Sequence, residues 1–243
     1  TSLLPRNEIR SPDPTFLPTE GTLANYRRVL AGEAFTDALV ISLTVTLLTV
    51  VLALAFGFIA ALAVSRFRFR GRWSLIVTLL LVQMIPVEAL FISQYKMLEG
   101  FDLLNTVAGL TLVYVASVLP FTIWVLRGFV AGVPFELEEA AMLDGCSRIG
   151  AFRRITFPLL APGLVATGVF GFIQAWNEFT LAVVVMTRED RRTLPLWLSG
   201  FVDVNRGTAW GAIMAGSTLI AVPVVLFFLI VQGRMVSGLT AGA

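Results

Sequence analysis

The chain of 243 residues has no histidine, one lysine, Lys96, and one cysteine, Cys146. The absence of histidine removes the commonest general base and metal ligand. A single cysteine cannot form an internal disulfide, and we interpret Cys146 as a small packing side chain rather than a reactive thiol. A phosphate-binding P-loop needs Gly-Lys followed by Ser or Thr. Lys96 does not follow a glycine, so we expect neither a nucleotide-binding motif nor an enzyme.

Charge is also scarce in this sequence. Only 14% of the residues are charged and 57% are hydrophobic, whereas soluble domains average about 25% charged residues. The formal net charge of +2 is too small to indicate a nucleic-acid partner. This composition predicts a protein that lies in a bilayer and contacts membrane lipid.

Five apolar stretches are long enough to cross the roughly 30 Å hydrocarbon layer of a membrane as helices. They predict an all-α membrane protein, a polytopic helical bundle with spans at about 38–64, 73–92, 104–126, 162–186 and 210–232. Residues 1–34 are polar and proline-rich, and we expect an extracytoplasmic segment there, followed by a transmembrane domain of residues 35–243. Because the chain begins at Thr1 without methionine, we expect a sixth span before this point in the full-length protein.

Polar side chains interrupt several of these spans. Pro86 is expected to kink the second span, because proline cannot donate a backbone hydrogen bond. Glu88 would cost about 3 kcal/mol at mid-depth in lipid, so it should face the bundle, a neighbouring protein or water. The candidates for a translocation path are Gln83, Glu88, Tyr114, Gln174, Trp176, Asn177 and Glu178. The alternative is hydrogen bonding between helices, and Trp176 by itself is more typical of packing or of an interface anchor.

A polar segment, residues 134–158, separates the third and fourth spans. Its charged side chains are Glu136, Glu138, Glu139, Asp144, Arg148, Arg153 and Arg154. Pro134 suits the first position of a helix whose early glutamates meet the positive end of the helix dipole. Gly145 is a natural helix stop, and Ser147 can cap a second helix that Pro158 would end. The pattern predicts a compact helix–Gly–helix hairpin with an acidic and a basic surface.

The hairpin carries a spaced motif: Glu139-Ala140-Ala141, three residues, Gly145, nine residues, then Ile155-Thr156-Phe157-Pro158. This spacing resembles the EAA loop of ATP-binding-cassette (ABC) importer permeases, and it departs from the family pattern only at Phe157, where the family has leucine. The resemblance implies a type I importer permease fold with a cytoplasmic coupling hairpin that docks on an ATPase subunit. The coupling residues it implies are Glu139, Ala140, Ala141, Asp144, Gly145, Ile155 and Pro158. Mg-ATP would bind the partner ATPases, so no cofactor is expected in this chain.

Two further strings resemble the carbohydrate, maltose-type branch of these permeases: FIQAWNEF at residues 172–179 and the tail SGLTAGA at residues 237–243. The resemblance implies import of a sugar or oligosaccharide, delivered by an extracytoplasmic solute-binding protein that touches loops such as 187–208. It also implies a multi-pass protein of the bacterial inner membrane. Its partners would be two ATP-binding subunits and a second permease subunit, a different chain with which it forms a heterodimer.

The resemblance also orients the chain, because it places the hairpin in the cytoplasm, with the first residues outside and the tail inside. The distribution of arginine and lysine near the span ends leans the same way, but only slightly. Three alternatives remain open: ABC import of another small polar solute, a proton-coupled secondary transporter that uses Glu88 and Glu178, and a membrane scaffold without a pore. Secondary transporters often contain inverted repeats, and none is visible in this sequence.

Overall fold

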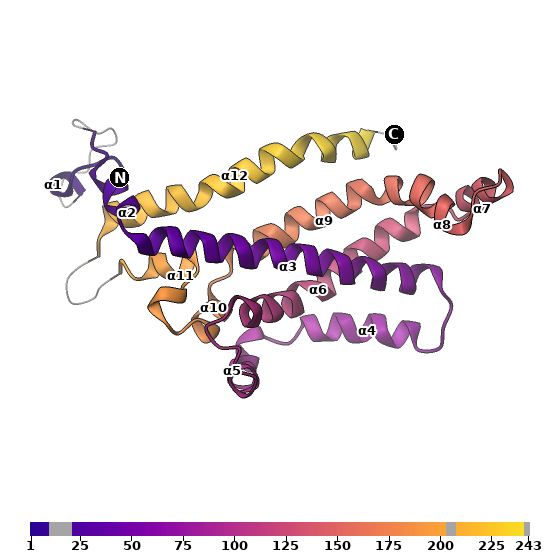
Figure 1. The fold of residues 1–243 in the computed structure, drawn as a ribbon, viewed down its shortest axis with the longest axis horizontal. Coiled ribbons are helices and arrows are strands. Elements are labelled where there is room, and N and C mark those ends of the chain that lie inside the picture. Colours follow the sequence, from indigo (N-terminus) through magenta and orange to yellow (C-terminus); the bar gives the residue numbers. More distant parts are fainter. Residues whose placement is uncertain (10–20, 203–207, 241–243) are drawn as a thin grey trace. The chain divides into compact units, whose positions relative to one another are not determined.

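Helices provide the regular structure of this chain (Figure 1). The computed structural model describes residues 1–9, 21–202 and 208–240, and this part contains α-helices, short 3-10 and π turns, and no strand. The predicted all-α class is therefore confirmed. Parts of the predicted N-terminal segment, of the loop 187–208 and of the C-terminal tail lie outside the described residues, namely 10–20, 203–207 and 241–243.

The helices follow one another in a simple order. They are α1 (Arg6–Ile9), α2 (Ala24–Leu30), α3 (Glu33–Arg66), α4 (Arg72–Gln83), η1 (Val87–Leu90), α5 (Phe91–Gly100), α6 (Val107–Gly132), α7 (Glu136–Leu143), α8 (Arg148–Ala151), η2 (Phe152–Thr156), α9 (Phe157–Asn177), α10 (Thr180–Val185), η3 (Glu189–Arg191), α11 (Leu194–Ser199) and α12 (Trp210–Thr240).

Within the described residues, four helical stretches are long and apolar enough to cross a membrane: Glu33–Arg66, Val107–Gly132, Arg148–Asn177 and Trp210–Gln232. A fifth crossing is counted if the broken pair around Pro86 is one span. In the most apolar stretch of α12, only 11% of the residues are buried inside the chain. Most of this helix is therefore left to contact lipid or a partner chain. The predicted polytopic bundle is confirmed.

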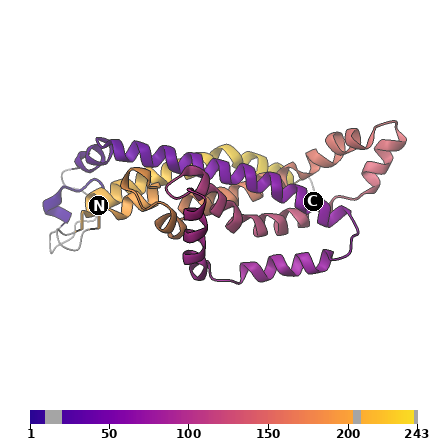
Figure 2. The same ribbon diagram turned by 60° about the horizontal axis from the view of Figure 1, so that its bottom comes forward.

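The second predicted span, 73–92, is not one kinked helix, and that prediction was wrong. Helix α4 ends at Gln83, and the chain bends by 93° at the break before η1 (Figure 2). Pro86 has φ −58° and ψ 124°, an extended conformation. Proline lacks the donor that would continue the helix, and its ring disfavours the helical region for the preceding residue. The helix therefore breaks rather than kinks.

The fourth predicted span, 162–186, is misplaced at its start. The helix is continuous from Arg148, through the π turn η2, into α9. The prediction that Pro158 ends the second hairpin helix was therefore wrong, because Pro158 lies in the first turn of α9. The π turn η2 ends two residues before Pro158. A π turn replaces the i→i+4 hydrogen bonds by i→i+5 bonds, so the helix continues although proline has no N–H to donate.

The same predicted span is also wrong at its end. Helix α9 stops at Asn177, and the short helix α10 begins at Thr180, so no single helix reaches Met186. The break consists of Glu178 and Phe179 and falls in the most polar part of the predicted span.

The chain divides into two compact units, and the first comprises residues 1–45, 93–110 and 176–227. Polar contacts hold its loops in place. The Ser42 hydroxyl accepts a hydrogen bond from the Leu194 N–H at 2.7 Å, which satisfies one of the donors that the start of α11 leaves unpaired. The Asn25 side-chain amide donates to the carbonyls of Ser2 and Leu4, both at 3.0 Å.

The second unit comprises residues 46–92, 111–175 and the chain from residue 228. One apolar cluster in it consists of side chains that are at most 2% exposed, Ala61, Leu126, Val130 and Leu160. Gly163 permits close packing of α9 against α6, because a Cβ atom there would overlap the ring of Phe129. This unit contains the whole hairpin of residues 134–158.

Candidate functional site

The first helix of the hairpin, α7, carries Glu136, Glu138 and Glu139 in its first turn, as predicted. Pro134 precedes this helix instead of occupying its first position, since α7 begins at Glu136. Negative side chains in the first turn meet the positive end of the helix dipole. The local sequence therefore favours a helix start here without a side-chain cap.

Helix α7 ends in a Schellman motif built on Gly145. Gly145 has φ +92°, its N–H donates to the Met142 carbonyl at 3.1 Å, and the Cys146 N–H donates to the Ala141 carbonyl at 3.0 Å. This pair of hydrogen bonds needs a residue in the left-handed conformation, which glycine adopts without strain. The predicted helix stop at Gly145 is confirmed.

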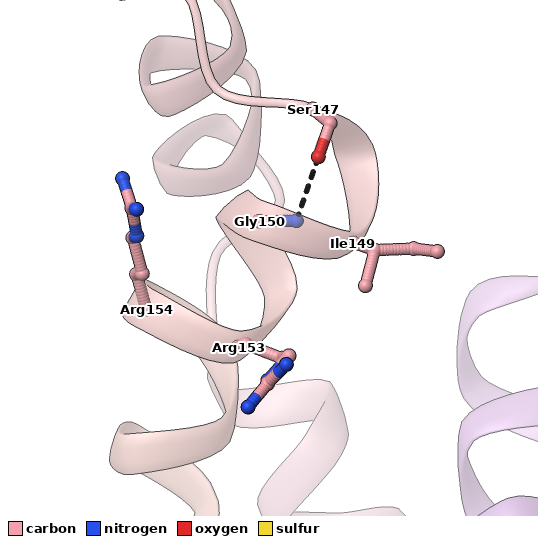
Figure 3. Close-up of a pocket in the computed structure, with 5 residues that line it drawn as sticks. All are labelled: Ser147, Ile149, Gly150, Arg153 and Arg154. Carbon is pink, nitrogen blue, oxygen red and sulfur yellow. Dashed lines mark hydrogen bonds between the residues drawn. The ribbon is translucent and has the colours of Figure 1, made fainter.

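The second helix of the hairpin carries the basic surface. Ser147 caps it as predicted, because the hydroxyl accepts a hydrogen bond from the Gly150 N–H at 3.1 Å. Arg153 and Arg154 follow in η2 and line, with these residues and Ile149, an open hollow of about 490 Å³ (Figure 3). Both arginines are exposed, so the hollow can receive a negatively charged group.

The predicted coupling residues differ in exposure. Those that are exposed are Glu139, Ala140, Asp144, Gly145 and Pro158, whereas Ala141 is buried and Ile155 is partly buried. Several large apolar side chains of the hairpin are also exposed, most of all Leu143 at 89% and Ile149 at 73%. Exposed apolar side chains with charged neighbours are typical of a surface that contacts another protein.

Glu138 is a residue whose position the sequence did not reveal. It is 6% exposed, its Oε1 accepts a hydrogen bond from the Thr156 hydroxyl at 2.6 Å, and the same oxygen lies 3.4 Å from Nη2 of Arg66. The Arg66 guanidinium also lies over the ring of Phe135, 5.4 Å from its centroid. One buried carboxylate thus joins the end of α3 to α7 and η2. The available sequence signal was helix register, since Glu138 shares a face with Ala141 three residues later.

Glu178, a candidate path residue, lies at the break between α9 and α10. Its Oε1 accepts a hydrogen bond from the Leu181 N–H at 2.8 Å, and its Oε2 accepts one from the Ala182 N–H at 3.2 Å. These N–H groups belong to the first turn of α10, where backbone donors have no partner inside the helix. Glu178 therefore has a structural role as a helix cap.

Trp176 and Tyr114 are candidates that the structure buries, each at 1% exposure. The indole N–H of Trp176 donates to the carbonyl of Ile220 in α12 at 3.1 Å, which is a hydrogen bond between helices. Tyr114 lies inside α6, in the other compact unit. Both side chains contribute to packing.

The remaining candidates present polar groups on the surface of the described chain. Gln83 ends α4, Glu88 lies in η1, and Gln174 lies in α9, and all three are exposed. Asn177, also exposed, lines a hollow of about 410 Å³ with Pro195 and Leu198 of α11 and Ser217, Ile220 and Ala221 of α12. This hollow is mainly apolar with two polar residues, a lining that suits a small organic solute.

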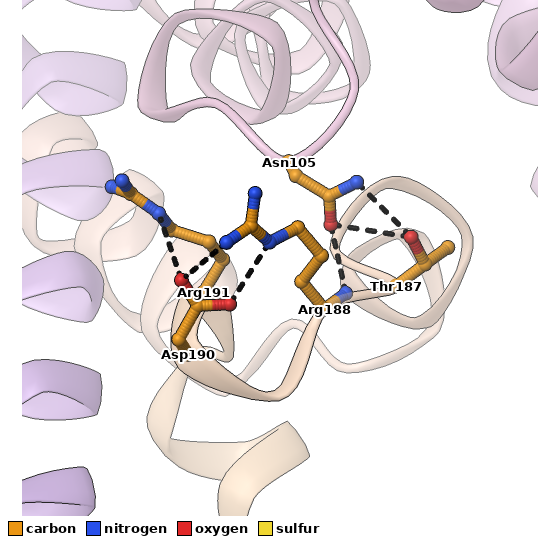
Figure 4. Close-up of polar contacts among 5 residues, drawn as sticks. All are labelled: Asn105, Thr187, Arg188, Asp190 and Arg191. Atoms are coloured by element: carbon orange, nitrogen blue, oxygen red, sulfur yellow. Dashed lines mark hydrogen bonds and ion pairs between the residues drawn. The ribbon is translucent and has the colours of Figure 1, made fainter.

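The loop after α10 is held by Asn105, a residue that sequence reasoning did not select (Figure 4). The Asn105 side chain exchanges hydrogen bonds with the Thr187 hydroxyl, and its Oδ1 accepts one from the Arg188 N–H at 2.8 Å. Asp190 accepts two hydrogen bonds from the Arg188 guanidinium, both at 3.0 Å. These hydrogen bonds, with the positive charges of Arg188 and Arg191, hold the pKa of Asp190 below its usual value.

Together these features define a class, a multi-pass helical membrane protein with a charged helical hairpin between two of its spans. Residues 53–240 match the family described as "Binding-protein-dependent transport system inner membrane component", and the chain belongs to that family. It is therefore a permease component of a transport system in the inner membrane, as the EAA spacing predicted. This membership decides against the secondary-transporter and scaffold hypotheses.

Several named relatives are similar over nearly the whole chain. The diacetylchitobiose uptake system permease protein DasC of Streptomyces coelicolor is 46% identical over 243 residues, which are 100% of this chain and 88% of the relative. The trehalose/maltose transport system permease protein MalG of Thermococcus litoralis is 38% identical, over 95% of this chain and 86% of its own. The trehalose transport system permease protein SugB of Mycobacterium tuberculosis is 36% identical, over 100% and 88%.

Solved structures share the fold. A chain of a bacterial ABC transporter involved in the import of the acidic polysaccharide alginate superposes with a TM-score of 0.81 at 22% identity, over 96% of this chain and 86% of that chain. A second structure, of a bacterial alginate ABC transporter in complex with an alginate pentasaccharide-bound periplasmic protein, gives a TM-score of 0.69 at 16% identity, over 89% and 82%. The predicted importer permease fold is confirmed.

Proposed function

We propose that this chain is the permease subunit of an ABC importer that moves a sugar or oligosaccharide into the cytoplasm. The observation that carries the proposal is the 46% identity over the whole chain to a diacetylchitobiose permease. The trehalose/maltose and trehalose permeases, at 38% and 36%, agree with it. The solutes in these three names are built from two sugar rings, so we expect a substrate of disaccharide size.

The energy source in this proposal is ATP hydrolysed by two partner subunits. The chain has no Gly-Lys-[Ser/Thr] sequence, so Mg-ATP would bind those subunits and this chain would not itself be an enzyme. The hairpin of residues 134–158 is the proposed contact with one of them. Exposed Glu139 would meet a basic side chain of the ATPase, Leu143 would fill an apolar groove, and the small Ala140 would permit close approach.

The pathway in this proposal is shared with a second permease subunit, a different chain. The exposed polar residues Gln83, Glu88, Gln174 and Asn177 are its candidate lining, because polar side chains near the middle of spans are costly unless they face protein or water. An extracytoplasmic solute-binding protein would deliver the sugar to the loop that Asn105 holds.

The test of the substrate class uses the transporter assembled with its permease partner, ATPases and binding protein in liposomes. We expect ATP-dependent uptake, and stimulated ATP hydrolysis, with at least one of N,N′-diacetylchitobiose, trehalose and maltose, and none with a free amino acid as the control solute. Stimulation by the amino acid and by none of the sugars would contradict sugar import while leaving the ABC assignment intact.

The test of the hairpin uses two variants, Glu139→Lys and Gly145→Pro. We expect both to insert into the membrane, and to lose uptake because docking on the ATPase is lost. Arg70→Gln, an exposed change in another loop, is the matched control and should transport normally. Normal uptake by both hairpin variants would show that the hairpin is not the coupling element.

A further inference from the structure

At the base of the hairpin, Arg66 from the end of α3 contacts Phe135 and Glu138, and Glu138 contacts Thr156. We call these four residues the Glu138 joint. The side chains of Arg66 and Glu138 are 17% and 9% exposed. The Nε and Nη2 atoms of Arg66 are buried and have no hydrogen-bond acceptor among the described residues. The 3.4 Å contact between Nη2 and Glu138 Oε1 is therefore a contact of opposite charges rather than an aligned hydrogen bond.

Burial makes this pair difficult to separate. A buried ion pair contributes little net stability, but removal of one partner leaves the other charge without compensation in a low dielectric. Arg66 also rests on the ring of Phe135, and a cation over an aromatic face is attracted to it. Each of these contacts would be lost if α7 moved away from the end of α3. Joint movement of the two helices therefore costs less free energy than their separation.

Further contacts connect α3 to the second helix of the hairpin. Thr156 of η2 donates its hydroxyl hydrogen to the same oxygen of Glu138 that faces Arg66. Phe58 of α3 contacts the rings of Phe152 and Phe157, at centroid distances of 6.3 and 6.1 Å. The hairpin is therefore attached to a third helix, in addition to α6 and α9, which flank it in the sequence.

We propose that Arg66 and Glu138 join the hairpin to α3 as one rigid body, so that a displacement of the hairpin by an ATPase is passed directly to this span. The inference rests on the proposed docking of the hairpin. It assigns Arg66 and Glu138 as positioning residues for coupling. Neither belongs to the EAA motif, which begins at Glu139.

The first experiment measures distances in the assembled transporter by double electron–electron resonance. Spin labels are placed at Ile59→Cys in α3 and Glu136→Cys in α7, both exposed, after Cys146→Ala removes the only native thiol. With the joint intact, we expect the same narrow distance distribution without nucleotide and with ATP plus vanadate. With Glu138→Gln, we expect the distribution to broaden and to shift on nucleotide binding. Identical behaviour of the two proteins would overturn the proposal.

The second experiment measures uptake per ATP hydrolysed in liposomes, with the radiolabelled sugar, among N,N′-diacetylchitobiose, trehalose and maltose, that the unchanged transporter takes up. We expect Glu138→Gln and Arg66→Gln to keep ATP hydrolysis, and the ratio to fall about 5-fold or more, the lower range of allosteric coupling. The exchanged pair Arg66→Glu with Glu138→Arg should restore it, and the exposed control Arg68→Gln should leave it unchanged. A merely structural role would lower the yield of assembled complex but not this ratio.

Failure of the joint can be told apart from failure of docking. Cross-linking of Leu143→Cys to the ATPase subunit tests docking alone, and its absence in the otherwise unchanged protein would refute the proposed function. A normal cross-link together with a normal ratio in Glu138→Gln would refute only the joint. If Glu138→Ala does not accumulate, Glu138→Gln, which keeps an acceptor for Thr156, and Arg66→Lys, which keeps the charge, carry the test.

Discussion

Two arginine–carboxylate pairs in this chain differ in both geometry and burial. Arg188 and Asp190 form two hydrogen bonds of 3.0 Å, but their side chains are 64% and 54% exposed. Arg66 and Glu138 have one contact of 3.4 Å, at 17% and 9% exposure. Geometry alone would rank the first pair as the stronger. Water and salt screen exposed pairs, whereas a buried charge cannot lose its partner without a large cost, so burial reverses the ranking.

The largest effect is expected for Glu138→Ala. It leaves Arg66 charged and buried without its carboxylate, and it removes the acceptor of the Thr156 hydroxyl, so we expect a loss of about 3–5 kcal/mol in the free energy of unfolding. Thermal unfolding of the purified protein in detergent, followed by tryptophan fluorescence, measures it. Glu139→Ala, one residue later and exposed, is the matched control and should melt like the unchanged protein.

A double variant tests whether the uncompensated charge of Arg66 causes the loss of stability in Glu138→Ala. Replacing a buried ion pair by apolar residues of similar volume is often neutral or stabilising, so Arg66→Met with Glu138→Leu should recover most of the stability that Glu138→Ala loses. If the double variant melts as low as the single one, the unpaired charge of Arg66 is not the cause.

The parts of this structure that depend on neighbouring residues could be predicted from the sequence. Gly145 ends a helix and Ser147 begins the next because each acts on backbone groups within a few residues. The long apolar stretches likewise show that the chain crosses a membrane. The same local reasoning failed at Pro158, because residues 152–156 form a π turn that no pattern in the sequence indicated.

The parts that depend on distant residues could not be predicted. Glu138 and Glu139 are adjacent and chemically identical, and only the contact with Arg66, from another span, makes the first a buried partner and leaves the second exposed. Glu178 resembled a path residue because it lies in an apolar stretch, yet its carboxylate caps a helix that the sequence did not indicate. The cap at Glu178 is local, but it exists only because α9 ends at Asn177, whereas the burial of Glu138 depends on a contact with another span.

An uncharged contact at the surface of the hairpin should have an effect between those of the two ion pairs. Ser147→Ala removes the hydrogen bond from the Gly150 N–H, and loss of such a cap costs about 1 kcal/mol. Ser147→Asp keeps an acceptor at the cap and should melt close to the unchanged protein. If Ser147→Ala lost as much stability as Glu138→Ala, burial would not be what sets the cost of losing a polar contact in this hairpin.

The smallest effect is expected for Asp190→Asn, although this change removes the better hydrogen-bonded pair. The hydrogen bonds from Arg188 lower the pKa of Asp190 below 3.8. A carboxyl group whose pKa is lowered on folding stabilises the protein above its unfolded pKa, and that contribution disappears as the pH falls through the lowered value. Because the Asp190 side chain is 54% exposed and its ion pair is screened by water and salt, we expect melting curves of the two proteins to coincide at neutral pH and physiological salt. Any difference that appears at low salt should vanish on acidification below the lowered pKa. A difference that persisted in acid or in high salt would show that Asp190 acts through something other than its charge, and burial would then no longer explain why the two pairs differ.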